Sequence, residues 1–379
     1  MNIKKCVFSI LSFLLILLLS ACHTEKVPDE SIKPQDAPKQ PDICGVWLSC
    51  YELSHMLRSG SEDEFRAEIG SVLGRCIESG INNVFIQVRP FADSVYPSDI
   101  YPASEYIISS LGEIPEFDVL EVFVELAHAE DISVHAWINP YRISYKTKAS
   151  ELSSNSIALN GEYKDGVVFT SVGVYLDPSS IQNQSLVLSG VREILDNYDV
   201  DGIHIDDYFY PVTDESFDES SYSDYCEKGG RMSLAQWRRE NDNCLVSSIY
   251  SLVHSYEGKL FSISPAGDID KNRNVYYADV KLWLSEEGYA DLIIPQIYFG
   301  FEHEDKPFEK IAKKWLSLKR ADGVRLACGL ALYKQGAEDE LAGKASKEWI
   351  DNSDVIERQI EYVNSSDYCG YVLFSYGDL

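Results

Sequence analysis

The chain has 379 residues, with 61 acidic against 33 basic side chains and a formal net charge of −28. So acidic a surface repels nucleic acid and anionic lipid headgroups, which excludes a nucleic-acid-binding protein and leaves cationic or neutral partners. The length beyond the first 42 residues is ordinary for a single α/β barrel.

Residues 1–21 are predicted to be a signal peptide, because Lys4 and Lys5 precede an apolar run over 7–19 and a small-residue cleavage site follows. That site, "LLSAC", resembles the lipobox of bacterial lipoproteins. The resemblance implies cleavage before Cys22 and lipid attachment to it, which would fix the chain to a membrane. An ordinary secretory signal is the alternative. Residues 22–42 are rich in proline and charge and lack apolar periodicity, so we expect a flexible tether.

Eight apolar, β-rich runs follow, separated by stretches with helical periodicity. Such alternation predicts a parallel sheet with helical crossovers, and eight strands are the number that closes a (β/α)₈ TIM barrel, here over residues 43–379. A doubly wound open sheet is the competing fold, but no glycine-rich phosphate loop follows the first run. The predicted strands lie at 45–50, 82–90, 132–140, 201–211, 260–267, 292–300, 325–333 and 370–376.

Helical periodicity is clearest over 62–80, where Phe65, Ile69, Val72, Leu73 and Cys76 share one face. Residues 117–131 and 353–363 show the same pattern. Between the third and fourth strands, "YKDGVVFTSVGVYLDP" predicts a hairpin that turns at "KDG". Together with the acidic, tyrosine-rich segment 212–231, it is expected to form the wall of a groove on the catalytic face.

The cysteines do not suggest a metal site. Seven remain after Cys22, and no pair has CxxC spacing, which argues against zinc. One or two disulfides remain open for an exported protein. We expect no metal and no other cofactor.

Polar residues collect at the ends of the predicted strands, where the catalytic groups of a (β/α)₈ barrel lie. Any one of them could be a buried polar group bonded to a neighbour, but together they favour an active site. As catalytic residues we expect Asp206 and Asp207. The residues expected to bind substrate are Arg89, Asn139, Arg142, His204, Tyr208, Gln296 and Tyr298.

The aspartate pair ends the stretch "DGIHIDDYFYP" at 201–211. Strand alternation directs His204 and Asp206 into the barrel, whereas Asp207 breaks the alternation unless the strand ends or bulges there. Two neighbouring carboxylates raise one pKa, because both cannot readily ionise in a desolvated cleft. The protonated partner can then act as a general acid at neutral pH.

Eight pieces of the chain resemble the glycoside hydrolase-like family 10 and stand in that family's order. The resemblance implies a (β/α)₈ barrel and a glycosidase that cuts bacterial envelope glycans, including peptidoglycan strands stripped of stem peptides. The pieces are "GVWL", "NNVFIQVRPFADSVYPS", "HAWINPYR", "YLDPSS", "DGIHIDDYFYP", "WRRENDN", "SISPAG" and "IIPQIYFG".

A more distant similarity is to the family 18 chitinases, which carry DGxDxDxE on the fourth strand. On that pattern Tyr208 occupies the place of the catalytic glutamate, so Asp207 becomes the candidate acid. Asp206 would polarise the substrate's 2-acetamido group, and Tyr298 matches the tyrosine that holds this group. No second carboxylate on another strand stands out for a conventional two-carboxylate mechanism.

The sequence therefore predicts a membrane-anchored glycoside hydrolase that acts on an envelope polysaccharide containing N-acetylhexosamine. We expect a monomer in the cell envelope, held by lipid to the outer face of a bacterial membrane. A non-catalytic glycan-binding lipoprotein is the main alternative. A scaffold that docks proteins is a third hypothesis, but docking would not need polar groups inside the barrel mouth.

Overall fold

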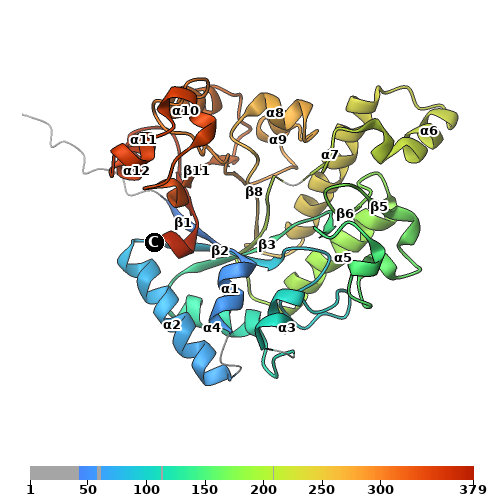
Figure 1. Cartoon of the computed structure of the whole chain (residues 1–379), viewed down its shortest axis with the longest axis horizontal. Helices are drawn as coiled ribbons and strands as arrows, with labels where there is room; N and C mark the ends of the chain where they lie inside the picture. Colours follow the sequence, from blue (N-terminus) through green and yellow to red (C-terminus); the bar gives the residue numbers. More distant parts are fainter. Residues whose placement is uncertain (1–41, 58–60, 112–113, 208) are drawn as a thin grey trace, which may run out of the picture. The chain divides into compact units, whose positions relative to one another are not determined.

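The computed structural model describes residues 42–57, 61–111, 114–207 and 209–379. Its strands form a parallel barrel, and helices lie between consecutive strands and around them (Figure 1). The predicted signal peptide, the tether, Cys22 and Tyr208 lie outside the described residues. Within the described part of the chain, no helix has the length and apolar character needed to cross a membrane.

The barrel has eight strand positions, all parallel to their neighbours, as the sequence predicted. Hydrogen bonding runs in the order β10-β9-β8-β7-β3-β2-β1-β12-β11. The pieces β10 and β11 are consecutive in the chain and separated only by Ala327; β10 pairs with β9 and β11 with β12, so together they close the ring. The strands are β1 (Ile43–Leu48), β2 (Asn83–Arg89), β3 (Ser133–Ile138), β7 (Gly202–Ile205), β8 (Leu260–Ile263), β9 (Leu292–Ile293), β10 (Arg325–Leu326), β11 (Cys328–Ala331) and β12 (Gly370–Phe374).

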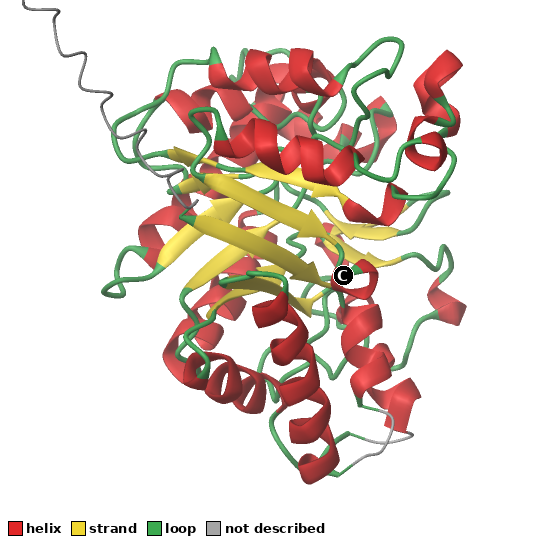
Figure 2. Cartoon of the chain, turned by 90° about the vertical axis from the view of Figure 1, so that its left-hand side faces the viewer, coloured by secondary structure: helices red, strands yellow, loops and turns green. Residues whose placement is uncertain are grey.

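Helices lie on either side of the central strands in Figure 2. They are α1 (Cys50–Met56), α2 (Glu62–Glu78), α3 (Glu105–Leu111), α4 (Val119–Ala129), α5 (Ile181–Asn197), α6 (Glu219–Glu227), α7 (Leu234–Val253), α8 (Ile269–Asn274), α9 (Val280–Ser285), α10 (Phe308–Leu316), α11 (Glu348–Asp351) and α12 (Val355–Asn364).

Helix α2 shows how local sequence sets these elements. The Ser61 side chain accepts a hydrogen bond from the Glu64 amide and caps the helix, and acidic residues fill the first turn, where the helix dipole favours negative charge. The five apolar residues of the predicted face are all buried, which confirms the periodicity. They pack in the large core between helices and barrel.

Side-chain alternation on β7 separates two cores. Ile203 and Ile205 face the outer core beneath the helices, whereas His204 faces the barrel interior. The interior is filled by mostly large side chains from the strands and the residues directly after them, and this packing fixes the strands relative to one another. These residues are Ile43, Trp47, Phe85, Trp137, Leu292, Ile294, Ala327 and Val372.

The predicted hairpin exists, but its turn was misplaced. "KDG" forms a short 3₁₀ turn, Lys164–Gly166, that leads into the hairpin. The strands that pair are β5 (Val167–Phe169) and β6 (Val174–Leu176), and β6 also pairs with β4 (Arg142–Ser144). The chain reverses between Thr170 and Gly173, where the Thr170 amide donates to the Gly173 carbonyl and Gly173 has a φ of 153°. Such a φ favours glycine, so Gly173 was the better turn signal.

Candidate active site

A cavity of about 480 Å³ opens at the carboxyl ends of the barrel strands. Its size is that of a pocket for a small ligand. Aromatic side chains supply much of its wall, and Asp206 and Asp207 both line it. The aromatic members are Trp47, Tyr51, Phe91, Trp137, Tyr145, Tyr298, Tyr333 and Phe374.

The pocket contains the predicted aspartate pair because β7 ends at Ile205. Asp206 and Asp207 follow in irregular backbone, so strand alternation no longer separates their side chains. From the sequence, the strand had to end or bulge here for both carboxylates to face one site, and the strand does end here.

Asp206 is held in a fixed orientation by Trp137 on β3 and by Asn139 just after that strand. Trp137 Nε1 donates to its Oδ2 at 3.0 Å, and Asn139 Nδ2 lies 3.2 and 3.3 Å from Oδ1 and Oδ2. The side chain is 3% exposed. Each carboxylate oxygen has two lone pairs, so these N–H donors fix the carboxylate and still leave lone pairs free to accept a hydrogen bond from a ligand.

The pKa of the Asp207 carboxyl group is raised toward neutrality. Burial is the main cause that raises its pKa, and the charge of Asp206 adds to it, so that the pKa reaches about 7. A hydrogen bond from the Gln296 amide and the nearby Lys271 act in the opposite direction. A carboxyl group with this pKa is still substantially protonated at neutral pH and can donate its proton.

Three of the expected substrate-binding residues line the same pocket: Arg142, Gln296 and Tyr298. Gln296 Nε2 donates to the Ser264 carbonyl at 2.9 Å, which fixes the amide beside Asp207. Arg142 Nη2 donates to the Pro90 carbonyl at 3.2 Å. Tyr298 is partly exposed in the pocket, and burial followed by the charge of Asp207 raises the pKa of its hydroxyl well above the ordinary value.

His204 lies below the pocket rather than in its wall. Trp47 Nε1 donates to His204 Nε2 at 3.1 Å, and Ser262 Oγ lies 2.8 Å from Nδ1. Since an indole N–H can only donate, Nε2 must accept, and the proton of the neutral ring sits on Nδ1. Burial keeps the pKa of His204 well below its usual value. His204 and Asn139 therefore shape the site from behind, Asn139 through its bond to Asp206.

Arg89 is not brought to the pocket. It is 1% exposed, its Nη1 donates to the Tyr101 hydroxyl at 2.9 Å, and its guanidinium lies 4.6 Å from the centre of that ring. Its close approach to Gly190 places it against α5, outside the barrel. The β2–β3 register shifts between Gln87 and Arg89, so Gln87 lines the pocket and Arg89 turns away. The expectation that Arg89 binds substrate is therefore wrong for this pocket.

Glu52 is a pocket carboxylate that our sequence reasoning missed. Its Oε2 accepts from the amide and hydroxyl of Ser49, both at 2.7 Å, and its Oε1 accepts from Ser375 Oγ at 2.8 Å and from the Gly377 amide. With both oxygens occupied, it ties α1 to the chain after β12. The pattern Ser-x-x-Glu at the end of the first strand is a capping box and was the available signal.

Asp93, the acidic residue that follows β2, is absent from the residues that line this pocket and lines a neighbouring cavity instead. Among the described residues, no cluster of three or more histidine, cysteine or acidic side chains is placed to hold a metal ion. The seven cysteines from Cys44 onward are free in the described part of the chain.

The fold and the pocket together define the class of protein to which this chain belongs. A carboxyl acid poised near neutrality, beside a second carboxylate and among aromatic side chains at the mouth of a (β/α)₈ barrel, places the protein among the glycosidase-like barrels. More narrowly, the chain belongs to the glycosyl hydrolase-like 10 family, whose model matches residues 42–351. This confirms the family that the sequence motifs indicated.

Two curated relatives cover most of the chain. Glycosyl hydrolase DigH of Escherichia coli K12 is 29% identical over 409 residues, covering 96% of this chain and 91% of its own. Glycosyl hydrolase YngK of Bacillus subtilis is 29% identical over 385 residues, covering 96% of this chain and 74% of its own. Among solved structures, an α-L-fucosidase from Paenibacillus thiaminolyticus matches 88% of this chain and 46% of its own at a TM-score of 0.48 and 13% identity.

Proposed function

We propose that this protein is a glycoside hydrolase that cleaves an N-acetylhexosamine-containing envelope glycan, with stem-peptide-free peptidoglycan strands as the substrate. The observation that carries the proposal is the unlike pair of neighbouring carboxylates in one pocket. Trp137 and Asn139 orient Asp206, and the pKa of Asp207 is about 7. The names of the relatives agree with hydrolysis of a glycosidic bond.

In the proposed reaction, protonated Asp207 donates its proton to the glycosidic oxygen as the bond to the anomeric carbon breaks. The oxygen of the 2-acetamido group attacks the anomeric carbon from the opposite side and forms a cyclic oxazolinium ion. The Asp206 carboxylate accepts the N–H of that group and stabilises its positive charge. Asp207, now ionised, removes a proton from water as the water opens the ring, which retains the anomeric configuration.

Substrate assistance is favoured because the third carboxylate of the pocket is already engaged. Among the described residues that line the cavity, the carboxylates are Glu52, Asp206 and Asp207. Both oxygens of Glu52 accept hydrogen bonds from Ser49, Ser375 and Gly377, so this side chain is held away from the role of nucleophile. The substrate's own acetamide supplies the missing nucleophile. Tyr298 lines the pocket near Asp207, and in the proposed reaction it would hold the acetamide.

We further propose that the mature chain is a lipoprotein that starts at lipidated Cys22. The lipobox-like "LLSAC" and the tether that follows support this, and the anchor would hold the barrel close to envelope glycan. The reaction itself needs no cofactor beyond water.

Purified full-length protein in detergent should be incubated with peptidoglycan strands with and without stem peptides, and with chitin oligomers. The products are then read by mass spectrometry. We expect new saccharide ends from the stripped strands, and none with Asp207→Asn. Binding of the strands without any cleavage by the wild type would reject the enzyme and favour the glycan-binding alternative.

A further inference from the structure

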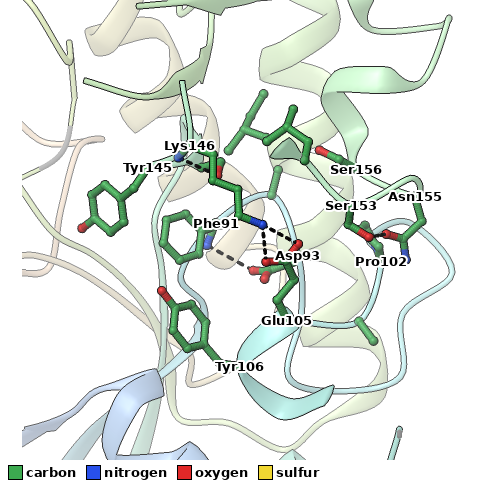
Figure 3. A pocket seen from close by; sticks show the side chains of 15 residues that line it. Phe91, Asp93, Pro102, Glu105, Tyr106, Tyr145, Lys146, Ser153, Asn155 and Ser156 are labelled. Carbon is green, nitrogen blue, oxygen red and sulfur yellow. Dashed lines mark hydrogen bonds and ion pairs between the residues drawn. The ribbon is translucent and has the colours of Figure 1, made fainter. Parts of the chain in front are cut away.

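A second cavity, of about 130 Å³, adjoins the proposed active site. It lies between the segment after β2, the start of α3, and the chain that follows β4. Phe91 and Tyr145 line both cavities, so their rings form a shared partition. Figure 3 shows Tyr145, Phe91 and Tyr106 along one side of the second cavity and Ser153, Asn155 and Ser156 along the other.

The partition is packed against Arg142 and Tyr106. The Arg142 guanidinium lies 4.8 Å from the centre of the Phe91 ring and 4.7 Å from that of Tyr145. Tyr106 stacks against Phe91 at 5.8 Å between ring centres. Tyr145 is 50% exposed, so one side of its ring remains open. An exposed aromatic ring between two adjoining cavities suits a glycan chain that passes from one to the other.

The polar groups of the second cavity are available to a ligand. Lys146 Nζ lies 2.8 and 3.2 Å from the two oxygens of Glu105, and Figure 3 shows Lys146 reaching across to it. Both side chains of this pair are about half exposed. Because such an exposed ion pair stabilises the protein only slightly, a ligand can displace one contact at little cost.

The shape and lining of the cavity favour one kind of group. At about 130 Å³ it is well below the roughly 300 Å³ and more of pockets that enclose whole ligands, so it suits a substituent and not a sugar ring. Pro102, Ala103, Ile143 and Leu152 offer apolar surface for a methyl group. Lys146 can donate to a carbonyl oxygen, and Glu105 can accept from an N–H.

Charge disfavours an acidic substituent. Glu105 and Asp93 line the cavity with two carboxyl groups against the single ammonium of Lys146. Asp93 accepts a hydrogen bond from the Phe91 amide at 3.2 Å, so it stays at the base of the partition. A carboxylate-bearing substituent, such as the lactyl ether of muramic acid, would meet net repulsion here.

We infer that this second cavity is a glycan subsite that receives the neutral acetamido group of an N-acetylated sugar, one or more units along the chain from the sugar held at Asp206 and Asp207. The inference rests on the proposed function and narrows its substrate to chains that carry an acetamido group at this distance. Phe91 and Tyr145 separate the two sites and carry the connecting sugar on the exposed face of Tyr145.

The test measures binding by calorimetry in full-length protein that carries Asp207→Asn, so that ligands are not cut. The ligands are stem-peptide-free peptidoglycan di-, tetra- and hexasaccharides. We expect affinity to rise with length, and Ser153→Trp, which fills the cavity, to weaken binding of the longest ligand on the order of tenfold while leaving the disaccharide unchanged. Ser154→Trp, at the neighbouring exposed residue outside the cavity lining, is the matched control and should bind all three normally.

Lys146→Ala tests the same site without added bulk, and it should reduce affinity for the hexasaccharide alone. Chemical N-deacetylation of both the disaccharide and the hexasaccharide should likewise remove the gain from length, because both then lack the acetamide bound at Asp206 and only the hexasaccharide loses the one in the second cavity. If Ser153→Trp and Lys146→Ala both bind the hexasaccharide as tightly as the Asp207→Asn parent, the subsite is rejected and the active site stands. If even the disaccharide fails to bind the parent, the proposed function fails and the subsite with it.

Discussion

Replacing Asp206 with asparagine should lower the pKa of Asp207 without returning it to normal. Burial is the larger cause of the elevated pKa of Asp207, and the Asp206 charge is the second. The amide side chain of the Asp206→Asn variant would keep the shape of the carboxylate, so the burial of Asp207 persists while the charge disappears. The two causes can therefore be separated in one variant.

The expected decrease in the pKa of Asp207 follows from the geometry of the pair. The pKa of Asp207 rises from 3.8 to about 7, a difference of roughly 4 kcal/mol between its two protonation states. A neighbouring opposite charge typically shifts the pKa of an aspartate by about 1–3 units, and a like charge at the same distance acts with similar strength in the other direction. Since Trp137 and Asn139 already place N–H groups against the Asp206 oxygens, we expect the low end, about one pH unit.

The assay is a pH titration of protein with ¹³C-labelled aspartate carboxyl groups, in which Asp207→Asn identifies the resonance that disappears. The same pKa should appear in kinetics. Because the acid must be protonated to act, kcat/KM should fall as the pH rises through about 7, and this limb should move to lower pH in Asp206→Asn. A wild-type pKa near 4 would refute the role of burial. An unchanged pKa in Asp206→Asn would refute the role of the Asp206 charge.

Three further predictions concern the pocket and the anchor. Tyr298→Phe should reduce kcat about tenfold through loss of one hydrogen bond to the acetamide, with an unchanged unfolding temperature; unchanged kinetics would place the acetamide elsewhere. Glu52→Ala should lower the free energy of unfolding by about 1–3 kcal/mol in urea titrations, because Ser49, Ser375 and Gly377 lose their acceptor. Glu52→Gln should lower it by less. Equal stability of the wild type and both variants would contradict this. Radioactive palmitate should label the wild type but not Cys22→Ala, and label retained in the variant would reject the lipobox.

The sequence was sufficient to predict the barrel, because apolar residues recur with different spacing in strands and in helices. Alternation on β7 also placed His204 inside and Ile203 outside. For Arg89, where the structure departs from the prediction, a single local irregularity is responsible. The register shift after Gln87 turned Arg89 toward α5, and nothing in the composition of β2 marks it.

The carboxylate of Glu52 was missed for a different reason. It comes from a helix that follows a strand, and its place at the pocket depends on Ser375 and Gly377, more than 320 residues away in the chain. The capping box could be read locally, but the contact across the closed barrel could not. The position of the hairpin turn was ambiguous in the sequence. Both "KDG" and Gly173 are turn signals, and only the pairing of β5 with β6 decides between them.

The roles of the two aspartates are tested most directly by comparing leaving groups. Asp207→Asn should lose at least about 10²-fold in cleavage of natural glycan, whose leaving oxygen needs a proton. It should retain far more activity on an aryl N-acetylhexosaminide with a good leaving group, because that bond breaks with little protonation.

Asp206→Asn serves as the matched variant in the same experiment. It should damage both substrates alike, because ring closure by the acetamide is needed in either reaction. The account predicts that the activated substrate rescues Asp207→Asn and not Asp206→Asn, as read from initial rates of product release. The reverse pattern would exchange the two roles, and full activity of both variants on natural glycan would contradict catalysis by this pair.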